Sequence, residues 1–253
     1  INVSKGASVI DYENGIVKYT VTISSQDGTW DNVTLHDVMT NIQLDTSKDI
    51  ILTKPDNTQQ ILTMPSNIGD FTLQLDKMAS GEKYVLEYYG KMPEGNFVSK
   101  KEAVNNVTVT SKDNHQTKIE HSASVSTTFK DLIKTGTDNK DGTISWNIII
   151  NPRKQNIGGW TLEDKIGIQG NQTELTNKQV TINPAVNSNG TLTNSITLPF
   201  TFPEGTTDKY TVTYTTDVAA EGTNTVNTAI LKPSNEKGWS ETVYQWVAST
   251  NQI

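Results

Sequence analysis

The chain has 253 residues, no cysteine and a net charge of −7. The lack of cysteine excludes disulfides, thiolate metal sites and cysteine nucleophiles. An acidic chain without a basic stripe lacks the surface that phosphate binding needs, so we expect no nucleic-acid partner.

The composition and length predict two β domains. Hydrophobic residues make up 34% of the chain, and threonine, asparagine, serine and valine recur in short alternating runs separated by turns such as Asp-Gly and Asn-Gly. Such runs are typical of strands with one polar face, and the length accommodates two cores of ordinary size. We therefore predict an all-β protein with two tandem immunoglobulin-like β-sandwich domains.

The same pattern of elements occurs twice along the chain. Residues 12–23 align with residues 139–150, each a turn followed by an alternating strand. Further along, residues 83–88 match residues 209–214, each another alternating strand. So long a period indicates tandem domains, because the repeats of a solenoid are much shorter. The predicted domains, with a boundary near residue 126, are residues 1–126 and 127–253.

Within this repeat, each half carries a lysine, an aspartate and an asparagine in the same order and at similar separations. The two trios are Lys5, Asp37 and Asn105 in the first half and Lys134, Asp164 and Asn227 in the second. A lysine amine and an asparagine carboxamide, held beside a carboxylic acid in a dry core, can join as an intramolecular isopeptide bond and release ammonia. This self-directed reaction needs no cofactor and no metal, and we do not expect an enzyme.

Burial gives each side chain its role in that reaction. It disfavours charge, so it lowers the pKa of the lysine, which becomes a neutral nucleophile, and raises the pKa of the aspartate, which is then protonated. The acid can hydrogen-bond the asparagine carbonyl and carry protons from the amine to the departing ammonia. Folding fixes the reacting groups at contact distance. Asp37 and Asp164 are the predicted proton shuttles.

Short segments around the trios form a recognisable pattern. In the second half they are Ile133–Gly136, Ile144–Ile148, Leu162–Ile166 and Val226–Asn227. In the first half they are Lys5–Gly6, Tyr19, Leu35–Asp37 and Val104–Asn106, with tyrosine in place of tryptophan and no threonine before the glycine. With these segments the chain resembles the collagen-adhesin family of Gram-positive surface proteins. The resemblance implies immunoglobulin-like domains with a Lys–Asn isopeptide bond and a catalytic aspartate in each half.

Two neighbouring residues compete for places in the trios. Asn106 is an alternative acceptor in the first half, and Lys130 is an alternative donor in the second. Because side chains alternate along a strand, an error of one residue puts the partner on the wrong face. The acidic stretch at residues 138–142 has oxygen ligands for calcium but lacks the later bidentate glutamate of a calcium loop, so we expect a hairpin turn there.

The ends of the chain and its hydropathy suggest an exported protein. No apolar run is long enough to cross a bilayer, so we expect no membrane insertion. The chain starts at Ile1 without a leader and ends at Ile253 without an anchor signal, so we expect a fragment of a longer extracellular protein that is anchored to the cell wall.

The resemblance implies a surface adhesin and permits a host extracellular matrix protein such as collagen as its ligand, and we expect a monomer. Since a fold does not fix a ligand, two alternatives stay open. One is a stalk or pilus-type spacer that binds nothing. The other is an accessory β sandwich of a secreted carbohydrate-active protein.

Overall fold

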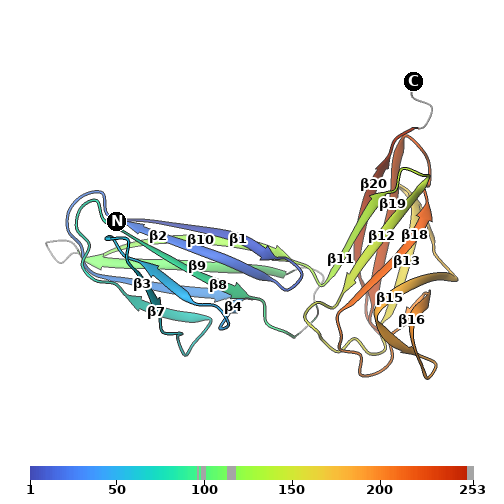
Figure 1. Cartoon of the computed structure of the whole chain (residues 1–253), viewed down its shortest axis with the longest axis horizontal. Helices are drawn as coiled ribbons and strands as arrows, with labels where there is room; N and C mark the ends of the chain where they lie inside the picture. Colours follow the sequence, from blue (N-terminus) through green and yellow to red (C-terminus); the bar gives the residue numbers. More distant parts are fainter. Residues whose placement is uncertain (96, 98–100, 113–117, 250–253) are drawn as a thin grey trace. The chain divides into compact units, whose positions relative to one another are not determined.

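The structure, a computed structural model, describes residues 1–95, 97, 101–112 and 118–249 (Figure 1). Its strands form four antiparallel sheets, and the described residues include no helix that could cross a membrane. The chain divides into two compact units, Ile1–Pro93 with Lys100–Phe129, and Glu94–Ser99 with Lys130–Ile253. Each unit is an immunoglobulin-like sandwich of two sheets, which confirms the predicted fold class.

The first unit combines a six-stranded and a four-stranded sheet. The six-stranded sheet has the order β1 (Asn2–Asp11), β2 (Ile16–Ser24), β8 (Lys83–Lys91), β5 (Ile50–Thr53) and β6 (Gln59–Leu62), with β4 (Gln43–Leu44) also paired to β8. The facing sheet has the order β10 (Lys118–Phe129), β9 (Lys101–Lys112), β3 (Asp31–Thr40) and β7 (Asp70–Gln74). Strands distant in sequence, such as β2 and β8, are thus neighbours in space.

The second unit repeats this plan with two five-stranded sheets. One has the order β11 (Leu132–Asp138), β12 (Thr143–Ile150), β18 (Tyr210–Asp217), β15 (Lys178–Ser188) and β16 (Thr191–Leu198). The other has the order β14 (Asn171–Glu174), β13 (Thr161–Ile168), β19 (Thr223–Lys232) and β20 (Trp239–Val247), with β17 (Phe200–Thr201) also paired to β13. The path β11-β12-β18 corresponds to β1-β2-β8, so the repeat in the sequence is a repeat of topology.

Alternation along the strands builds each core. The buried residues of β2 are Val17, Tyr19, Val21 and Ile23, and those of β12 are Ile144, Trp146, Ile148 and Ile150. Because side chains alternate between the two faces of a strand, every second side chain points toward the facing sheet. A polar side chain at one of these inward positions needs a partner, because burying an unpaired polar group is costly.

The division between the units falls at the end of a strand. β10 runs through residue 126 and ends at Phe129, and the second unit resumes at Lys130. The second unit also includes Phe97, whose ring centre lies 5.2 Å from that of Trp160 and 4.9 Å from that of Trp239. The core of this unit therefore draws on a residue that lies, in sequence, between β8 and β9.

The acidic stretch at residues 138–142 is a hairpin turn, as predicted. β11 ends at Asp138, β12 begins at Thr143, and Gly142 has a φ of 88° that suits glycine. The carboxylate of Asp138 accepts a hydrogen bond from the backbone of Lys140 at 2.9 Å, so its oxygen serves the turn itself. Among the residues that the structure describes, no group of three or more acidic or histidine side chains could hold a metal ion.

Candidate functional site

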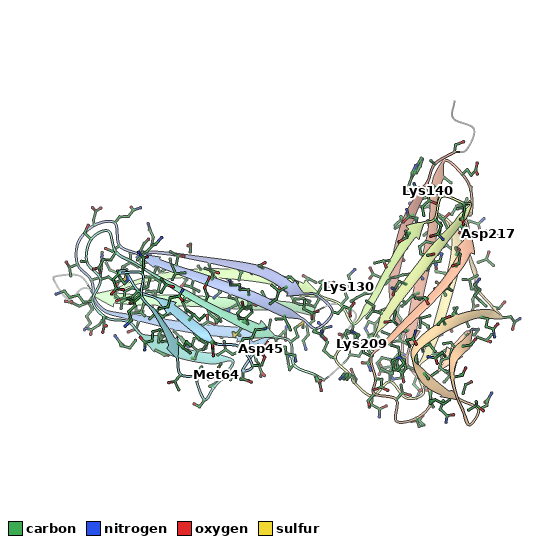
Figure 2. The ribbon with its side chains drawn as sticks, viewed as in Figure 1. Asp45, Met64, Lys130, Lys140, Lys209 and Asp217 are labelled. Atoms are coloured by element: carbon green, nitrogen blue, oxygen red, sulfur yellow. The ribbon has the colours of Figure 1, made fainter. Side chains whose placement is uncertain are left out.

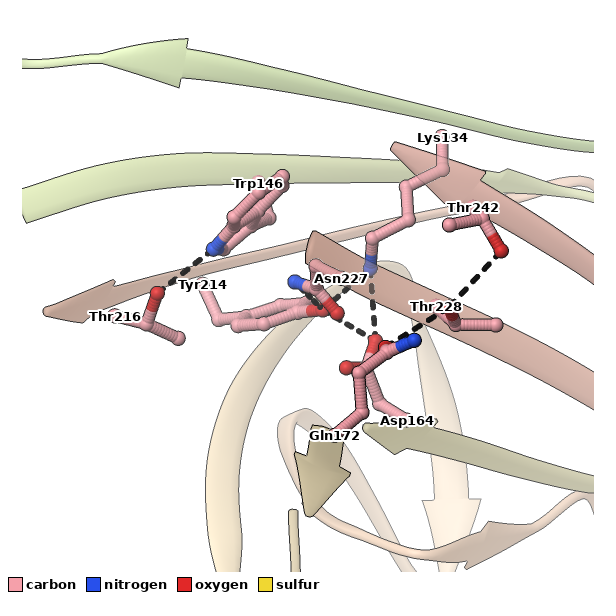
Figure 3. Close-up of polar contacts among 9 residues, drawn as sticks. All are labelled: Lys134, Trp146, Asp164, Gln172, Tyr214, Thr216, Asn227, Thr228 and Thr242. Atoms are coloured by element: carbon pink, nitrogen blue, oxygen red, sulfur yellow. Dashed lines mark hydrogen bonds and ion pairs between the residues drawn. The ribbon is translucent and has the colours of Figure 1, made fainter. Parts of the chain in front are cut away.

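Each sandwich buries one polar cluster between its two sheets. In the second unit, Lys134 on β11 and Tyr214 on β18 belong to one sheet, whereas Asp164 on β13 and Asn227 on β19 belong to the facing sheet (Figure 3). The corresponding residues of the first unit are Lys5 on β1, Tyr88 on β8, Asp37 on β3 and Asn105 on β9. Both clusters therefore bridge the two sheets of their sandwich.

Strand pairing sets the positions of the acid and the amide. In the first unit Asp37 lies opposite Val107 on β9, and Asn105 stands two residues before Val107. The second unit has the same register, with Asp164 opposite Ala229 of β19. A step of two residues keeps the aspartate and the asparagine on the same inward face of their sheet.

In the second unit, three polar groups meet at one tyrosine hydroxyl. Nζ of Lys134 donates hydrogen bonds to Oδ2 of Asp164 at 2.8 Å and to the hydroxyl of Tyr214 at 2.6 Å. That hydroxyl donates to Oδ2 of Asp164 and accepts a hydrogen bond from Nδ2 of Asn227 at 3.0 Å. Nζ of Lys134 also lies 5.5 Å from the ring centre of Trp146. The amine and the carboxamide thus contact the same oxygen atom.

The first unit has the same arrangement. Nζ of Lys5 lies 3.1 Å from Oδ2 of Asp37 and 2.5 Å from the hydroxyl of Tyr88. The hydroxyl donates to Asp37 and accepts a hydrogen bond from Nδ2 of Asn105 at 3.0 Å. Tyr19 takes the place of Trp146, with its ring centre 5.3 Å from Nζ of Lys5.

Burial decides the electrostatics of both clusters. The lysine and aspartate side chains are all fully buried, at 0% exposure. Burial lowers the pKa of Lys5 and Lys134, and the attraction of the adjacent carboxylate only partly opposes it. Burial also raises the pKa of Asp37 and Asp164 against the opposing pull of the lysines. Although the contacts have the geometry of ion pairs, burial shifts both groups toward their neutral forms, an amine and a carboxylic acid.

Four oxygen atoms in the two clusters have no hydrogen-bond donor. They are Oδ1 of Asp37, Asn105, Asp164 and Asn227. Each cluster therefore holds one carboxyl oxygen and one carboxamide oxygen that are buried without a partner, which is unfavourable. A proton on the aspartate would supply the donor that the asparagine oxygen lacks.

The two alternative residues lie outside these clusters. Asn106 is exposed, on the face of β9 opposite to the buried Asn105. Lys130, which is labelled in Figure 2, precedes β11 and donates a hydrogen bond to Glu241 at 2.7 Å. The structure thus brings together the lysine, aspartate and asparagine of each predicted trio and leaves both alternatives out.

Tyr88 and Tyr214 lie at the centre of the two clusters, although the sequence pattern did not identify them as site residues. They end the two matching segments at residues 83–88 and 209–214, so the repeat placed them at equivalent positions. This equivalence of the two tyrosines in the repeat was the one sign in the sequence that they belong to the site. A tyrosine on a buried strand is ordinarily a core residue, and only the packing of one sheet on the other shows that its hydroxyl meets the trio.

The sequence pattern matched Gly6 of the first half with Gly136 of the second, and the strand register shows that this match is wrong. In the first unit Ala7 lies opposite Tyr19, and in the second unit Gly136 lies opposite Trp146. Alignment on the lysines therefore matches Gly136 with Ala7. A Cβ atom on Gly136 would stand 2.5 Å from the indole of Trp146, so the larger ring requires glycine, whereas the tyrosine ring leaves room for the methyl group of alanine.

No protein-family model matches the sequence, and a comparison with curated proteins finds no significant match. Among solved structures, domains D2 and D3 of the major pilin SpaD from Corynebacterium diphtheriae align with 98% of this chain and 89% of their own, at 13% identity and a TM-score of 0.42. The collagen-binding domain of a Staphylococcus aureus adhesin aligns with 51% of this chain and 97% of its own, at 15% identity and a TM-score of 0.35.

A third similar structure is the collagen-binding subdomain of the Enterococcus faecalis surface protein ACE. It aligns with 49% of this chain and 93% of its own, at 11% identity and a TM-score of 0.34. Similarity at these levels carries no argument about function, which rests on the buried clusters instead. These three solved structures are a pair of pilin domains and two collagen-binding domains.

Proposed function

We propose that this chain is part of an extracellular surface adhesin or pilin-type protein whose two sandwiches are each closed by an autocatalytic Lys–Asn isopeptide bond. The observation that supports this proposal is the occurrence of one buried cluster of lysine, aspartate, asparagine and tyrosine, with the same strands and the same contacts, in both units. Fully buried lysine side chains are rare. One such lysine at the equivalent place between the two sheets of each unit supports a chemical role for the lysine.

The reaction balances without a cofactor. In the second unit, Nζ of Lys134 attacks the side-chain carbonyl carbon of Asn227, an amide bond forms, and the carbon–nitrogen bond of the carboxamide breaks to release ammonia. Asp164 donates its proton to the unpartnered carbonyl oxygen of Asn227, which makes the carbon more electrophilic, and its Oδ2 accepts a proton from the amine. The proton taken from the amine passes on to the departing nitrogen, which leaves as ammonia, and the oxygen returns its proton to Asp164 as the carbonyl re-forms. Lys5, Asn105 and Asp37 have the same roles in the first unit.

The bond would join the first strand of each unit to a strand near its end. In the first unit it links β1 to β9, and in the second it links β11 to β19, in each case across the two sheets. By analogy with a disulfide that closes a loop of about 100 residues, it stabilises a unit by on the order of 4 to 5 kcal/mol. Tension applied to the first strand would pass through the crosslink, a function suited to a protein that holds a cell to a surface.

Intact-mass spectrometry of the folded chain tests the proposal. The chain should be lighter than its sequence mass by two molecules of ammonia. Lys134→Ala should abolish one loss, and Lys130→Ala, a change at the nearby lysine that contacts Glu241, should retain both. A chain with its full sequence mass would exclude the isopeptide bonds.

A ligand-binding role is supported by exposed aromatic side chains on β20. Tyr244 is 55% exposed and Trp246 is 57% exposed, and large exposed aromatics are common where a protein contacts a partner. We propose an extracellular matrix protein of the collagen type as that partner. Binding of the purified chain to immobilised collagen, weakened in Trp246→Ala, would support this role, whereas no binding by the wild type would favour a spacer that only separates other domains from the cell.

A further inference from the structure

The hydroxyl of the clustered tyrosine contacts both nitrogen atoms of the proposed reaction. In the second unit it lies 2.6 Å from Nζ of Lys134 and 3.0 Å from Nδ2 of Asn227. In the first unit the corresponding distances from Tyr88 are 2.5 Å to Lys5 and 3.0 Å to Asn105. One nitrogen must lose a proton and the other must gain one, and this oxygen stands between them.

The hydrogen bonds of this hydroxyl match its full capacity. A phenol oxygen has one proton and two lone pairs. In the second unit Tyr214 gives its proton to Asp164 and accepts hydrogen bonds from Lys134 and Asn227. Burial raises the pKa of Tyr214, and of Tyr88 in the first unit, so the phenol keeps its proton. The tyrosine is therefore a fully bonded centre that fixes the positions of its three neighbours.

This arrangement also prepares the lysine for attack. A neutral amine has two protons and one lone pair. Lys134 donates to Oδ2 of Asp164 and to the hydroxyl of Tyr214, which occupies both protons and leaves the lone pair free for the carboxamide carbon. The hydrogen bond from Nδ2 of Asn227 to the same hydroxyl fixes the orientation of the amide, so that its oxygen is left for the proton of the acid.

The described contacts of Asp164 do not extend to the nitrogen that departs. Its Oδ2 contacts the amine and the hydroxyl, whereas Nδ2 of Asn227 contacts the hydroxyl. A proton that passes from the amine to Asp164 therefore needs an intermediate group to reach Nδ2. The tyrosine hydroxyl contacts both Oδ2 of Asp164 and Nδ2 of Asn227.

We propose that Tyr214 and Tyr88 are catalytic residues of isopeptide formation, which relay the proton from the aspartate to the departing ammonia. The inference rests on the proposed function. As the lysine attacks, Oδ1 of the aspartate gives its proton to the asparagine oxygen, and Oδ2 takes one from Nζ. Oδ2 then passes a proton to the tyrosine oxygen while the tyrosine gives its own to Nδ2. The oxygen of the tetrahedral carbon returns its proton to Oδ1, ammonia leaves, and the phenol and the acid end unchanged.

The test measures the rate of ammonia loss in the full chain. Wild type and variants are made by cell-free synthesis, quenched with acid at intervals and analysed by mass spectrometry of the intact chain and of its crosslinked peptides. Tyr214→Phe keeps the ring and deletes the hydroxyl, so bond formation in the second unit should slow by about a hundredfold, the lower range for loss of a proton-transfer group. The bond of the first unit, in the same molecule, serves as the internal reference.

Tyr210→Phe is the matched control. Tyr210 is a buried tyrosine on the same strand, and its change should leave both rates near those of the wild type. Thermal unfolding of both phenylalanine variants in the Lys134→Ala background separates a catalytic effect from a structural one. We expect similar melting temperatures and a rate loss confined to Tyr214→Phe.

Equal rates for Tyr214→Phe and the wild type would overturn the tyrosine proposal and leave the isopeptide proposal intact. A wild-type chain that loses no ammonia would instead overturn the proposed function itself. If Tyr214→Phe fails to fold, Tyr88→Phe and uniform replacement of tyrosine by fluorotyrosine repeat the test. Fluorotyrosine preserves the ring and makes the hydroxyl more acidic, so an unchanged rate would also count against the relay.

Discussion

Gly136 and Trp146 face each other across the β11–β12 pair, and a Cβ atom on Gly136 would stand 2.5 Å from the indole ring. The ring in turn lies 5.5 Å from Nζ of Lys134, and its Nε1 donates a hydrogen bond to Thr216 at 2.8 Å. A glycine on the edge strand of the second unit thus fixes the position of the aromatic ring beside the buried lysine.

Gly136→Ala should therefore displace Trp146 and loosen the second cluster. Overpacking of this kind costs about 1 to 3 kcal/mol, and the bond of the second unit should form more slowly because the amine loses its aromatic support. Gly6→Ala is the control, since no atom lies within 4 Å of the added carbon. Thermal unfolding and the time course of ammonia loss check both variants. Equal behaviour of the two would contradict the proposed role of Gly136.

The two adjacent asparagines of β9 give a test of the acceptor. Asn105→Ala should remove one ammonia loss and lower the stability of the first unit by on the order of 4 to 5 kcal/mol, the value for an equivalent disulfide loop. Asn106→Ala changes an exposed residue and should keep both losses. Mass spectrometry and urea unfolding measure the two effects. Loss of the bond in Asn106→Ala would show that the register differs from that described.

A variant without the second nucleophile should show the pH dependence of its buried acid. Lys134→Met removes the amine whose attraction opposes the effect of burial, and burial already raises the pKa of the Asp164 carboxyl above its ordinary 3.8. The folded state then keeps a proton that the unfolded state has released. Stability should decrease as the pH rises above 3.8, by up to about 1.4 kcal/mol per pH unit, until the folded pKa is reached.

Urea unfolding of Lys134→Met from acid to neutral pH measures this slope. The matched variant Lys134→Met with Asp164→Asn lacks the titrating group and should have a flatter profile over the same range. If the free energy of unfolding of Lys134→Met increased with pH relative to that of the double variant, Asp164 would be ionised in the folded state.

The first strand of the first unit should depend strongly on the proposed crosslink. No residue of β1 is fully buried as a whole, although the side chain of Lys5 itself is inaccessible. In the second unit β11 has an additional anchor, because Leu132 is 1% exposed. Lys5→Ala should therefore increase backbone hydrogen exchange along β1 by more than Lys134→Ala does along β11. Equal exchange in the two strands would contradict this difference in anchoring.

The sequence by itself determined the fold class and the members of the two trios. Period-two alternation in segments such as Ile16–Ser24 follows from strand geometry, and it identifies inward positions without knowledge of the partner strand. The repeat then singled out lysine, aspartate and asparagine at matching places, because two copies of one sandwich put equivalent side chains at equivalent positions. Local pattern was sufficient for both results.

Only the tertiary structure decided how these residues meet. The choice of Asn105 over Asn106 depends on the register of β9 against β3, and the pairing of Ala7 with Tyr19 depends on the register of β1 against β2. The place of Tyr214 at the centre of its cluster depends on one sheet packing over the other. Register and sheet packing join residues far apart in the chain, and the pKa shifts of the buried groups follow from the same enclosure, so no local pattern contains them.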